Sequence, residues 1–189
     1  MHIISEIPWD GQYAKKTRGI YCIPVCWLLR DRMLFNHLKL VTLEGDTALN
    51  PDAMLCTGIN KVDPWQQDKL AVLSAYTLES FTEDGWLYMV PKPVDPLNPK
   101  AHLRECVKVT DTLLPSEFSE GYLETTNTHA PELTIGDKKI NAFRFRRGDY
   151  ILRSDRHLSP WVVDRKIFNQ TYELTLRVFP TNIQTDING

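Results

Sequence analysis

The spacing of apolar residues predicts a helix early in the chain and a strand directly after it. Apolar side chains recur at roughly helical spacing after Pro24, a residue suited to the first helical turn because its missing N–H is not needed there. We therefore predict a helix from Pro24 to residue 36. Residues 38–43 form a short apolar run that predicts a strand, closed by a turn at residues 44–46.

A capping signal predicts a second helix in the first half of the chain. Asp63 can accept hydrogen bonds from the free N–H groups of a helix start, Pro64 suits the first helical position, and Gln66 completes a capping box. Apolar residues continue at helical spacing as far as Tyr76. We expect this helix to end before or near Phe81.

A proline-rich stretch offers the one credible domain boundary. After a predicted turn and a strand at residues 86–90, four prolines fall within residues 91–99, which disfavours both a helix and a central strand. We predict an α+β N-terminal lobe at residues 1–90, a connector at 91–99 and a β-rich C-terminal lobe at 100–189. The alternative is a single domain over residues 1–189, in which the prolines carry the chain across one face.

The second half of the chain is patterned mainly for strands. Strands are predicted at residues 103–110, in a hairpin of 133–135 with 140–146, and at 174–178, whereas residues 113–129 are predicted irregular or briefly helical. Together these patterns predict an α+β fold. It has a mixed, mainly antiparallel sheet, two or three helices and a β-rich C-terminal module.

The end of the chain carries a motif that resembles a known family. Gly148 and Asp149 predict a turn into a strand, a second strand follows at Trp161, and Phe168 is expected to close the small sheet from a helical turn before a Tyr172-Glu173 ending. This pattern resembles the C-terminal signature of the PGDYG family, small proteins common in bacteriophages and prophages. The resemblance covers about thirty of the 189 residues and implies a phage or prophage accessory gene, with no particular activity.

Composition is that of an ordinary globular protein, with 42% hydrophobic and 24% charged residues. Four cysteines are too few for a disulfide scaffold in a chain of this length. Residues 1–8 lack the basic and apolar regions of a signal peptide, and the longest apolar stretch, residues 20–29, is about half a membrane span. We therefore expect a cytoplasmic protein, in the host cell cytoplasm if it is phage-encoded, with no membrane partner.

Charge is divided unevenly along the chain, although the net charge is only −2. Residues 79–137 hold eleven acidic and four basic side chains, and residues 138–177 hold ten basic and four acidic ones. Such a division can mark a face for an anionic partner. Alternatively, the two segments pack side by side and neutralise each other.

Residue types that carry catalysis or bind metals occur without the spacing that such sites need. Cys22 and Cys26 could bind zinc with His37 or His102, but the sequence offers no second close pair of ligands. The nine glycines form no phosphate-binding loop, and the five histidines form no metal motif. We predict no metal, no cofactor and no catalytic residue. Enzymatic activity stays open, and the sequence favours a non-enzymatic role.

Basic and aromatic residues are interleaved near the end of the chain and are the best candidates for a binding surface. Arginine pairs with phosphates or carboxylates, and aromatic rings stack on bases. The same alternation also fits a strand with one core face and one wet face. The candidate binding residues are Arg144, Arg146, Arg147, Tyr150, Arg153 and Trp161.

Three functional hypotheses follow, of which the first is favoured. The first is a non-catalytic phage or prophage accessory protein that binds and modulates a host macromolecule. A host protein is the expected partner, and nucleic acid is the alternative at the basic-aromatic face. The second is an enzyme or sequestering protein for a nucleotide or other small phosphorylated ligand, held by Arg144, Arg146 or Arg153. The third is a minor virion or structural component. No pattern predicts the oligomeric state.

Overall fold

Strands make up most of the structure. The computed structural model of the chain describes residues 1–28, 38–42, 45–127, 130–154 and 159–175, and within these ranges it has sixteen strands and two α-helices of seven residues each. The predicted α+β fold class is therefore wrong, because the described chain is a mainly β protein with two short helices.

The strands are β1 (Ile3–Ile4), β2 (Tyr13–Lys16), β3 (Ile20–Pro24), β4 (Lys39–Thr42), β5 (Gly45–Ala48), β6 (Ala53–Thr57), β7 (Trp65–Asp68), β8 (Tyr76–Phe81), β9 (Leu87–Pro91), β10 (Leu103–Lys108), β11 (Gly121–Glu124), β12 (Glu132–Ile135), β13 (Lys138–Phe145), β14 (Tyr150–Arg153), β15 (Trp161–Val163) and β16 (Tyr172–Leu174). The helices are α1 (Lys69–Ala75) and α2 (Arg165–Thr171), with short 3-10 turns η1 (Val25–Trp27) and η3 (Pro99–Ala101).

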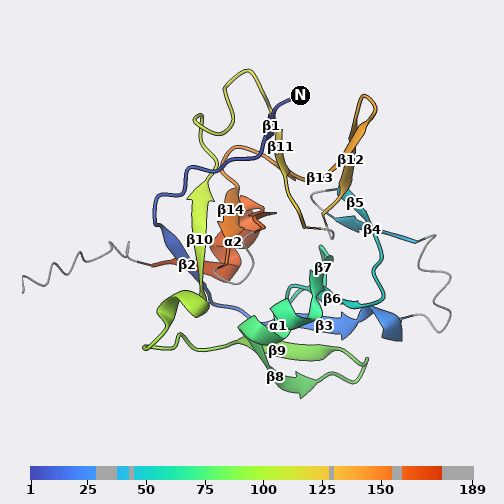
Figure 1. Cartoon of the computed structure of the whole chain (residues 1–189). Helices are drawn as coiled ribbons and strands as arrows, with labels where there is room; N and C mark the ends of the chain where they lie inside the picture. Colours follow the sequence, from blue (N-terminus) through green and yellow to red (C-terminus); the bar gives the residue numbers. More distant parts are fainter. Residues whose placement is uncertain (29–37, 43–44, 128–129, 155–158, 176–189) are drawn as a thin grey trace, which may run out of the picture.

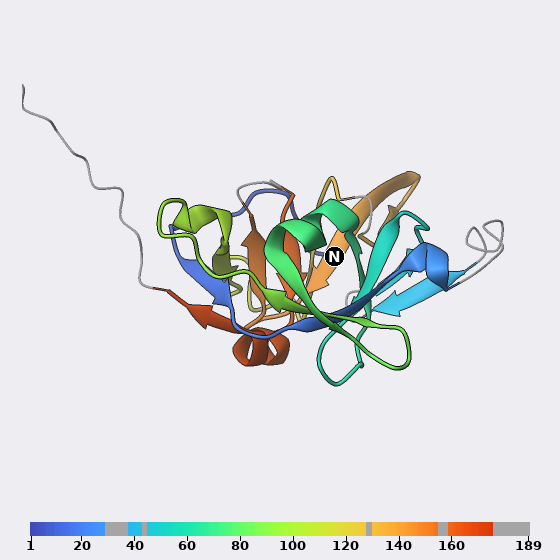
Figure 2. The same cartoon turned by 90° about the horizontal axis from the view of Figure 1, so that it is seen from below.

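The strands form four sheets, in which the neighbouring strands are antiparallel except β1 with β11 (Figure 1). Sheet A has the order β1-β11-β13-β12, sheet B β15-β14-β10-β2-β16 and sheet C β7-β6-β3-β9-β8, and sheet D is the hairpin β4-β5. Val72 of α1 is buried in the core of sheet C, and Phe168 of α2 in the core of sheet B. In Figure 2, α2 lies at the lower edge of the molecule and α1 lies above it, nearer the middle. Among the described residues, no helix has the length and apolar character needed to cross a membrane.

Sheets B and C have the same arrangement of strands. Each sheet includes one strand, β2 in sheet B and β9 in sheet C, whose next strand along the chain lies in the other sheet. β2 lies beside β10 and β16 in sheet B, although the chain continues from it directly into β3 of sheet C. β9 lies beside β3 and β8 in sheet C, although the next strand along the chain is β10 of sheet B (Figure 1). The first repeat is therefore β2-β3-β6-β7-α1-β8 and the second β9-β10-β14-β15-α2-β16, with their first strands exchanged.

Register and hydrogen bonds show that the two repeats match residue by residue. The Thr17 N–H donates to Thr171 O at 2.9 Å, and the Lys92 N–H donates to Ala75 O at 2.9 Å, which is the same bond made once in each half. Equivalent residues, first repeat then second, include Cys22/Cys106, Cys56/Leu152, Trp65/Trp161, Asp68/Asp164 and Tyr76/Tyr172. The chain therefore contains two structural repeats with the same strand order and register.

The proline-rich segment at residues 91–99 carries the chain from β9 in sheet C to β10 in sheet B. Sheet C is built within the first half of the chain, whereas β1 and β2 cross over to sheets A and B. The division into lobes at 1–90 and 100–189 stays a prediction. β2 of the first range lies between β10 and β16 of the second range in sheet B, so the two ranges share a sheet.

The predicted helix over residues 64–81 is wrong. β7 and β8 occupy its two ends, and α1 lies between them with the Asp68 side chain as its N-cap. Gln66, expected in a capping box, instead donates to Ala48 O at 2.6 Å and accepts from the Asn50 N–H at 2.6 Å. These two bonds tie β7 to the end of β5 and hold Gln66 in an extended segment.

Most strand predictions in the second half are confirmed. β10, the β12–β13 hairpin, β14 and β15 lie where the alternation places them, and α2 replaces the expected helical turn. Residues 113–129 were predicted irregular or briefly helical, but they contain β11. In the first half, β4 confirms the strand at 38–43. The helix predicted after Pro24 starts as η1, and its remainder, like most of the strand predicted at 174–178, falls outside the described residues.

The Gly148-Asp149-Tyr150 motif has a structural explanation. Gly148 has a φ of 93°, a backbone conformation that favours glycine. The buried Asp149 carboxylate accepts from the backbone N–H of Arg165 at 3.0 Å, at the start of α2, and from a second backbone N–H within the turn at 2.8 Å. Tyr150 stacks on Phe168 of α2 with ring centroids 3.6 Å apart. The motif therefore fixes α2 against β14.

Lys16 on β2 lies where the two repeats meet. Its Nζ atom is 4.9 Å from the ring centroid of Tyr172, 5.6 Å from that of Tyr76 and 5.6 Å from that of Trp65. Tyr76 and Tyr172 are equivalent residues, but the register partner of Tyr172 is Lys16 and that of Tyr76 is Pro91. At this equivalent position the first repeat has the cationic Lys16 and the second repeat has Pro91.

The surroundings of Lys16 favour its charged form. Burial alone lowers the pKa of Lys16, but its interactions with the hydroxyls of Tyr172 and Tyr76 outweigh burial and raise the pKa above its ordinary value of 10.5. Burial raises the pKa of Tyr76 to about 12, against an opposing effect of Lys16. Both side chains thus hold their protons more tightly in the folded chain than in the unfolded chain.

We predict that Lys16→Met lowers the free energy of unfolding by about 1–3 kcal/mol, because methionine keeps the apolar stem and removes the charge beside three rings. Since both folded pKa values are raised, the stabilisation is complete below about pH 10 and is lost as the pH rises through the folded values. Urea unfolding should therefore show a difference between wild type and Lys16→Met that shrinks above about pH 10. A difference that stays constant to about pH 12 would argue against a charged Lys16 at this junction.

We predict that Asp149→Ala lowers the free energy of unfolding by about 1–3 kcal/mol, because two backbone N–H groups lose the buried carboxylate that accepts their hydrogen bonds. Chemical denaturation followed by circular dichroism measures the loss. Asp137→Ala, at an exposed turn position, is the matched control and should change stability by less than about 0.5 kcal/mol. Equal losses in the two variants would contradict the role given to Asp149.

Candidate protein-binding surface

Two loops of sheet C meet at one end of the sheet and present aromatic and apolar side chains. One is the β6–β7 loop, residues 58–64, and the other is the β8–β9 turn, residues 82–86. We refer to both loops, together with Tyr21, Phe81 and Tyr88, as the tip surface. The Tyr21 and Tyr88 rings contact each other across β3 and β9, with centroids 5.1 Å apart.

The β6–β7 loop is held in an unusual backbone conformation. Among the described residues, Lys61 and Asp63 are the non-glycine positions with positive φ, at 52° and 56°. The Lys61 N–H donates to Gly58 O at 2.9 Å, and the Thr57 hydroxyl donates to Val62 O at 3.1 Å. Such conformations cost about 1–3 kcal/mol each and persist where neighbouring contacts impose them. These hydrogen bonds therefore hold the backbone of the β6–β7 loop in a defined conformation.

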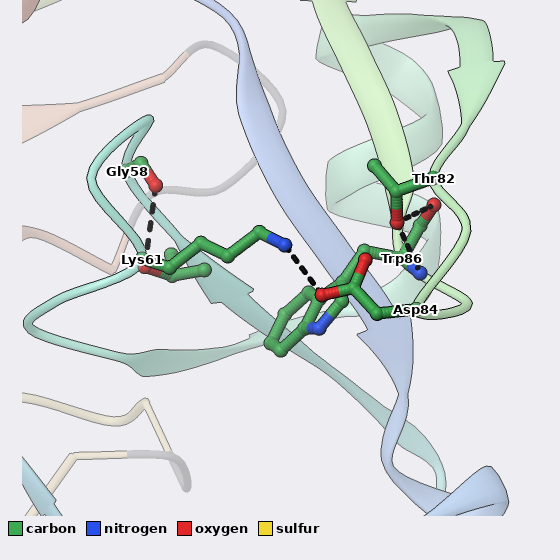
Figure 3. Close-up of polar contacts among 6 residues, drawn as sticks. Gly58, Lys61, Thr82, Asp84 and Trp86 are labelled. Carbon is green, nitrogen blue, oxygen red and sulfur yellow. Dashed lines mark hydrogen bonds and ion pairs between the residues drawn. The ribbon is translucent and has the colours of Figure 1, made fainter.

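The β8–β9 turn is closed by hydrogen bonds to Thr82. The Thr82 N–H donates to Trp86 O at 2.8 Å, the Thr82 hydroxyl accepts from the Trp86 N–H at 2.9 Å, and Thr82 O accepts from the Gly85 N–H at 3.0 Å. Gly85 has a φ of 85°, which a residue with a side chain rarely adopts. This turn places the Trp86 ring beside the β6–β7 loop (Figure 3).

An ion pair joins the two loops over aromatic rings. Lys61 Nζ lies 2.6 Å from Asp84 Oδ2, 5.0 Å from the ring centroid of Tyr21 and 5.8 Å from that of Trp86 (Figure 3). The Lys61 ammonium and the Thr82 hydroxyl lower the pKa of Asp84, so its carboxylate is charged at neutral pH. An exposed pair of this kind contributes little stability. It joins the two loops at this end of sheet C, and the backbone hydrogen bonds within each loop hold the loop's conformation.

Large apolar side chains on the β6–β7 loop and at the end of β8 are open to solvent. Ile59 is 44% exposed, Val62 58% and Phe81 68%. The scaffold does not require an aromatic cluster here, because the second repeat has Glu105 at the position of Tyr21. Exposed apolar groups beside tryptophan and tyrosine are typical of protein-binding surfaces.

The predicted binding residues near the end of the chain are distributed over several places. Arg144 of β13 and Arg146 directly after it lie 3.9 Å and 3.8 Å from the same carboxylate oxygen of Glu120. Arg147 pairs with Asp111 at 2.7 Å. It also donates to a backbone carbonyl at 2.7 Å.

The other three predicted residues lie on sheet B. Arg153 donates from Nε and Nη2 to one oxygen of Glu105, at 2.7 Å and 2.6 Å, and lies 4.3 Å from the Trp9 ring centroid. Tyr150 is buried against α2, and Trp161 packs partly buried against the same cluster. Whether any of the six residues binds a ligand stays a prediction.

The ion pairs of these arginines join the acidic segment to the basic segment. Glu105, Asp111 and Glu120 belong to residues 79–137, and their partners belong to residues 138–177. Lys138–Glu124 and Lys139–Glu132 also cross between the two segments. This is the arrangement in which the uneven charges of the two segments neutralise each other.

The tip surface was not found from the sequence. The turn at residues 82–85 was recognised, but nothing in the spacing of Tyr21, Lys61 and Trp86 indicates that they meet. Cys22, considered for a zinc site, is buried opposite Cys56 in sheet C, while His37 falls outside the described residues. Among the described residues no group of three potential metal ligands occurs.

Comparisons with known proteins find no family model, no curated protein and no solved structure that matches this chain. The resemblance of about thirty residues near the end of the chain to the PGDYG family stays a prediction.

Proposed function

We propose that the protein is a non-catalytic accessory protein that binds another protein through the tip surface and modulates it. The observation that carries the proposal is the set of exposed apolar side chains Ile59, Val62 and Phe81 on or next to two loops that the Lys61–Asp84 pair joins over a Tyr–Trp cluster. Rigid aromatic anchors bind partners at a low cost in conformational entropy, and tryptophan and tyrosine are enriched among residues that dominate binding energy. The PGDYG resemblance supports a phage or prophage origin, with the host cytoplasm as the place of action.

The proposed partner presents a basic segment to this surface. Four acidic side chains lie on the two loops and β8, and Lys61 is the basic side chain among them: the acids are Asp63, Glu79, Glu83 and Asp84. Complementary charge speeds association and selects partners. The same carboxylates repel phosphates, which favours a protein over nucleic acid at this surface.

We predict that Phe81→Asp removes binding to the partner while leaving the fold intact, because Phe81 is 68% exposed. The measurement is affinity capture from a bacterial lysate, followed by titration with the purified captured protein. Leu97→Asp is the matched control, since Leu97 is 94% exposed and lies in the proline-rich segment. Loss of a central anchor weakens binding by about thirtyfold or more.

The proposal requires that a captured protein bind wild type and Leu97→Asp equally and Phe81→Asp weakly, with an affinity that falls as salt is added. Equal binding to all three proteins would reject the tip surface as the site. Recovery of the bare protein at every salt concentration would reject the proposed function itself.

A further inference from the structure

The two repeats carry different inserts, and these inserts meet at a cavity. The insert of the first repeat, between β3 and β6, contains the β4–β5 hairpin, and that of the second, between β10 and β14, contains β11, β12 and β13. β5 lies close to β12 in Figure 1, and residues of β5, β12 and β13 line the same cavity. A cavity of about 650 Å³ separates the hairpin from sheet A.

Small residues keep this space open. The four residues of β5, Gly45–Ala48, all line the cavity, and Ala142 of β13 lies on the opposite wall. The two inserts touch where Gly45 approaches Pro131, because a Cβ added to Gly45 would lie 3.2 Å from the Pro131 Cβ.

Basic side chains enter the cavity from both inserts. Lys39 of β4 and Arg144 of β13 line it. Glu132, an acidic lining residue, is paired with Lys139 at 2.7 Å.

Polar groups next to the basic ones can orient a ligand. Tyr122 is the register partner of Arg144 across β11 and β13, so both side chains stand on the same face of sheet A. The Tyr122 hydroxyl donates to Glu120 at 3.0 Å, and Thr47 and Asn141 add further polar atoms to the lining. Asp46 is the second acidic lining residue, and it lies on β5.

We propose that this insert cavity binds an organic anion of about nucleotide size, with its phosphate or carboxylate at Arg144 and Lys39. The volume falls within the roughly 300–1,000 Å³ of sites for small molecules. A guanidinium binds phosphate or carboxylate through paired hydrogen bonds. The site is separate from the tip surface, and it uses one of the arginines that the sequence singled out.

The test is a titration of the whole protein with AMP, UMP, citrate and inorganic phosphate, followed by calorimetry and thermal shift. At least one of the organic anions should bind at one site per chain, and Arg144→Gln should weaken its binding by about tenfold or more. Arg146→Gln is the matched control, because Arg146 shares the Glu120 partner but does not line the cavity. It should leave the affinity within about twofold of wild type.

A second variant separates loss of binding from loss of fold. Ala48→Trp places a large ring in the cavity from an exposed position and leaves both basic side chains in place, so it should also block binding. Failure of all four compounds to bind would overturn the proposal. Equal weakening by Arg144→Gln and Arg146→Gln, or binding of inorganic phosphate as tight as that of the organic anions, would also overturn it.

Discussion

The exchange of β2 and β9 between the repeats is the constraint on which the rest of the structure depends. A strand of one repeat completes the sheet of the other, so neither sheet B nor sheet C can form its full set of hydrogen bonds from one repeat alone. Lys16 lies at this junction, beside the equivalent residues Tyr76 and Tyr172. Because an unpaired sheet edge leaves backbone groups without partners, the exchange makes the two halves one cooperative body.

Function is expected where the two repeats differ. The scaffold positions, such as the helix caps Asp68 and Asp164, are kept in both copies. The tip surface and the insert cavity instead include residues that differ between the copies: Tyr21 corresponds to Glu105, and the two inserts have different strand patterns. A scaffold repeated twice can thus carry two different surfaces, with binding residues on the loops and inserts that it positions.

Local signals predicted the second half of the chain better than the first. Alternation and a glycine turn sufficed for the β12–β13 hairpin and β14. The helix predicted at residues 64–81 failed because Gln66 makes its bonds to β5, a contact that no local pattern reveals. The repeat leaves only a weak trace in the sequence because few residue types recur. Trp65, Asp68 and Tyr76 recur as Trp161, Asp164 and Tyr172, and most residues between them differ. The tip surface depends on contacts far apart in sequence, so periodicity could not find it.

Native-state hydrogen exchange at the Thr17 and Lys92 amides tests the exchange of strands most directly. These two N–H groups make the equivalent bonds that follow β2 and β9, to Thr171 and Ala75. Reciprocal exchange predicts that both amides open only with global unfolding and therefore with the same free energy. Opening of the Thr17 amide at a free energy about 2 kcal/mol or more below that of Lys92, with sheet C still protected, would contradict it.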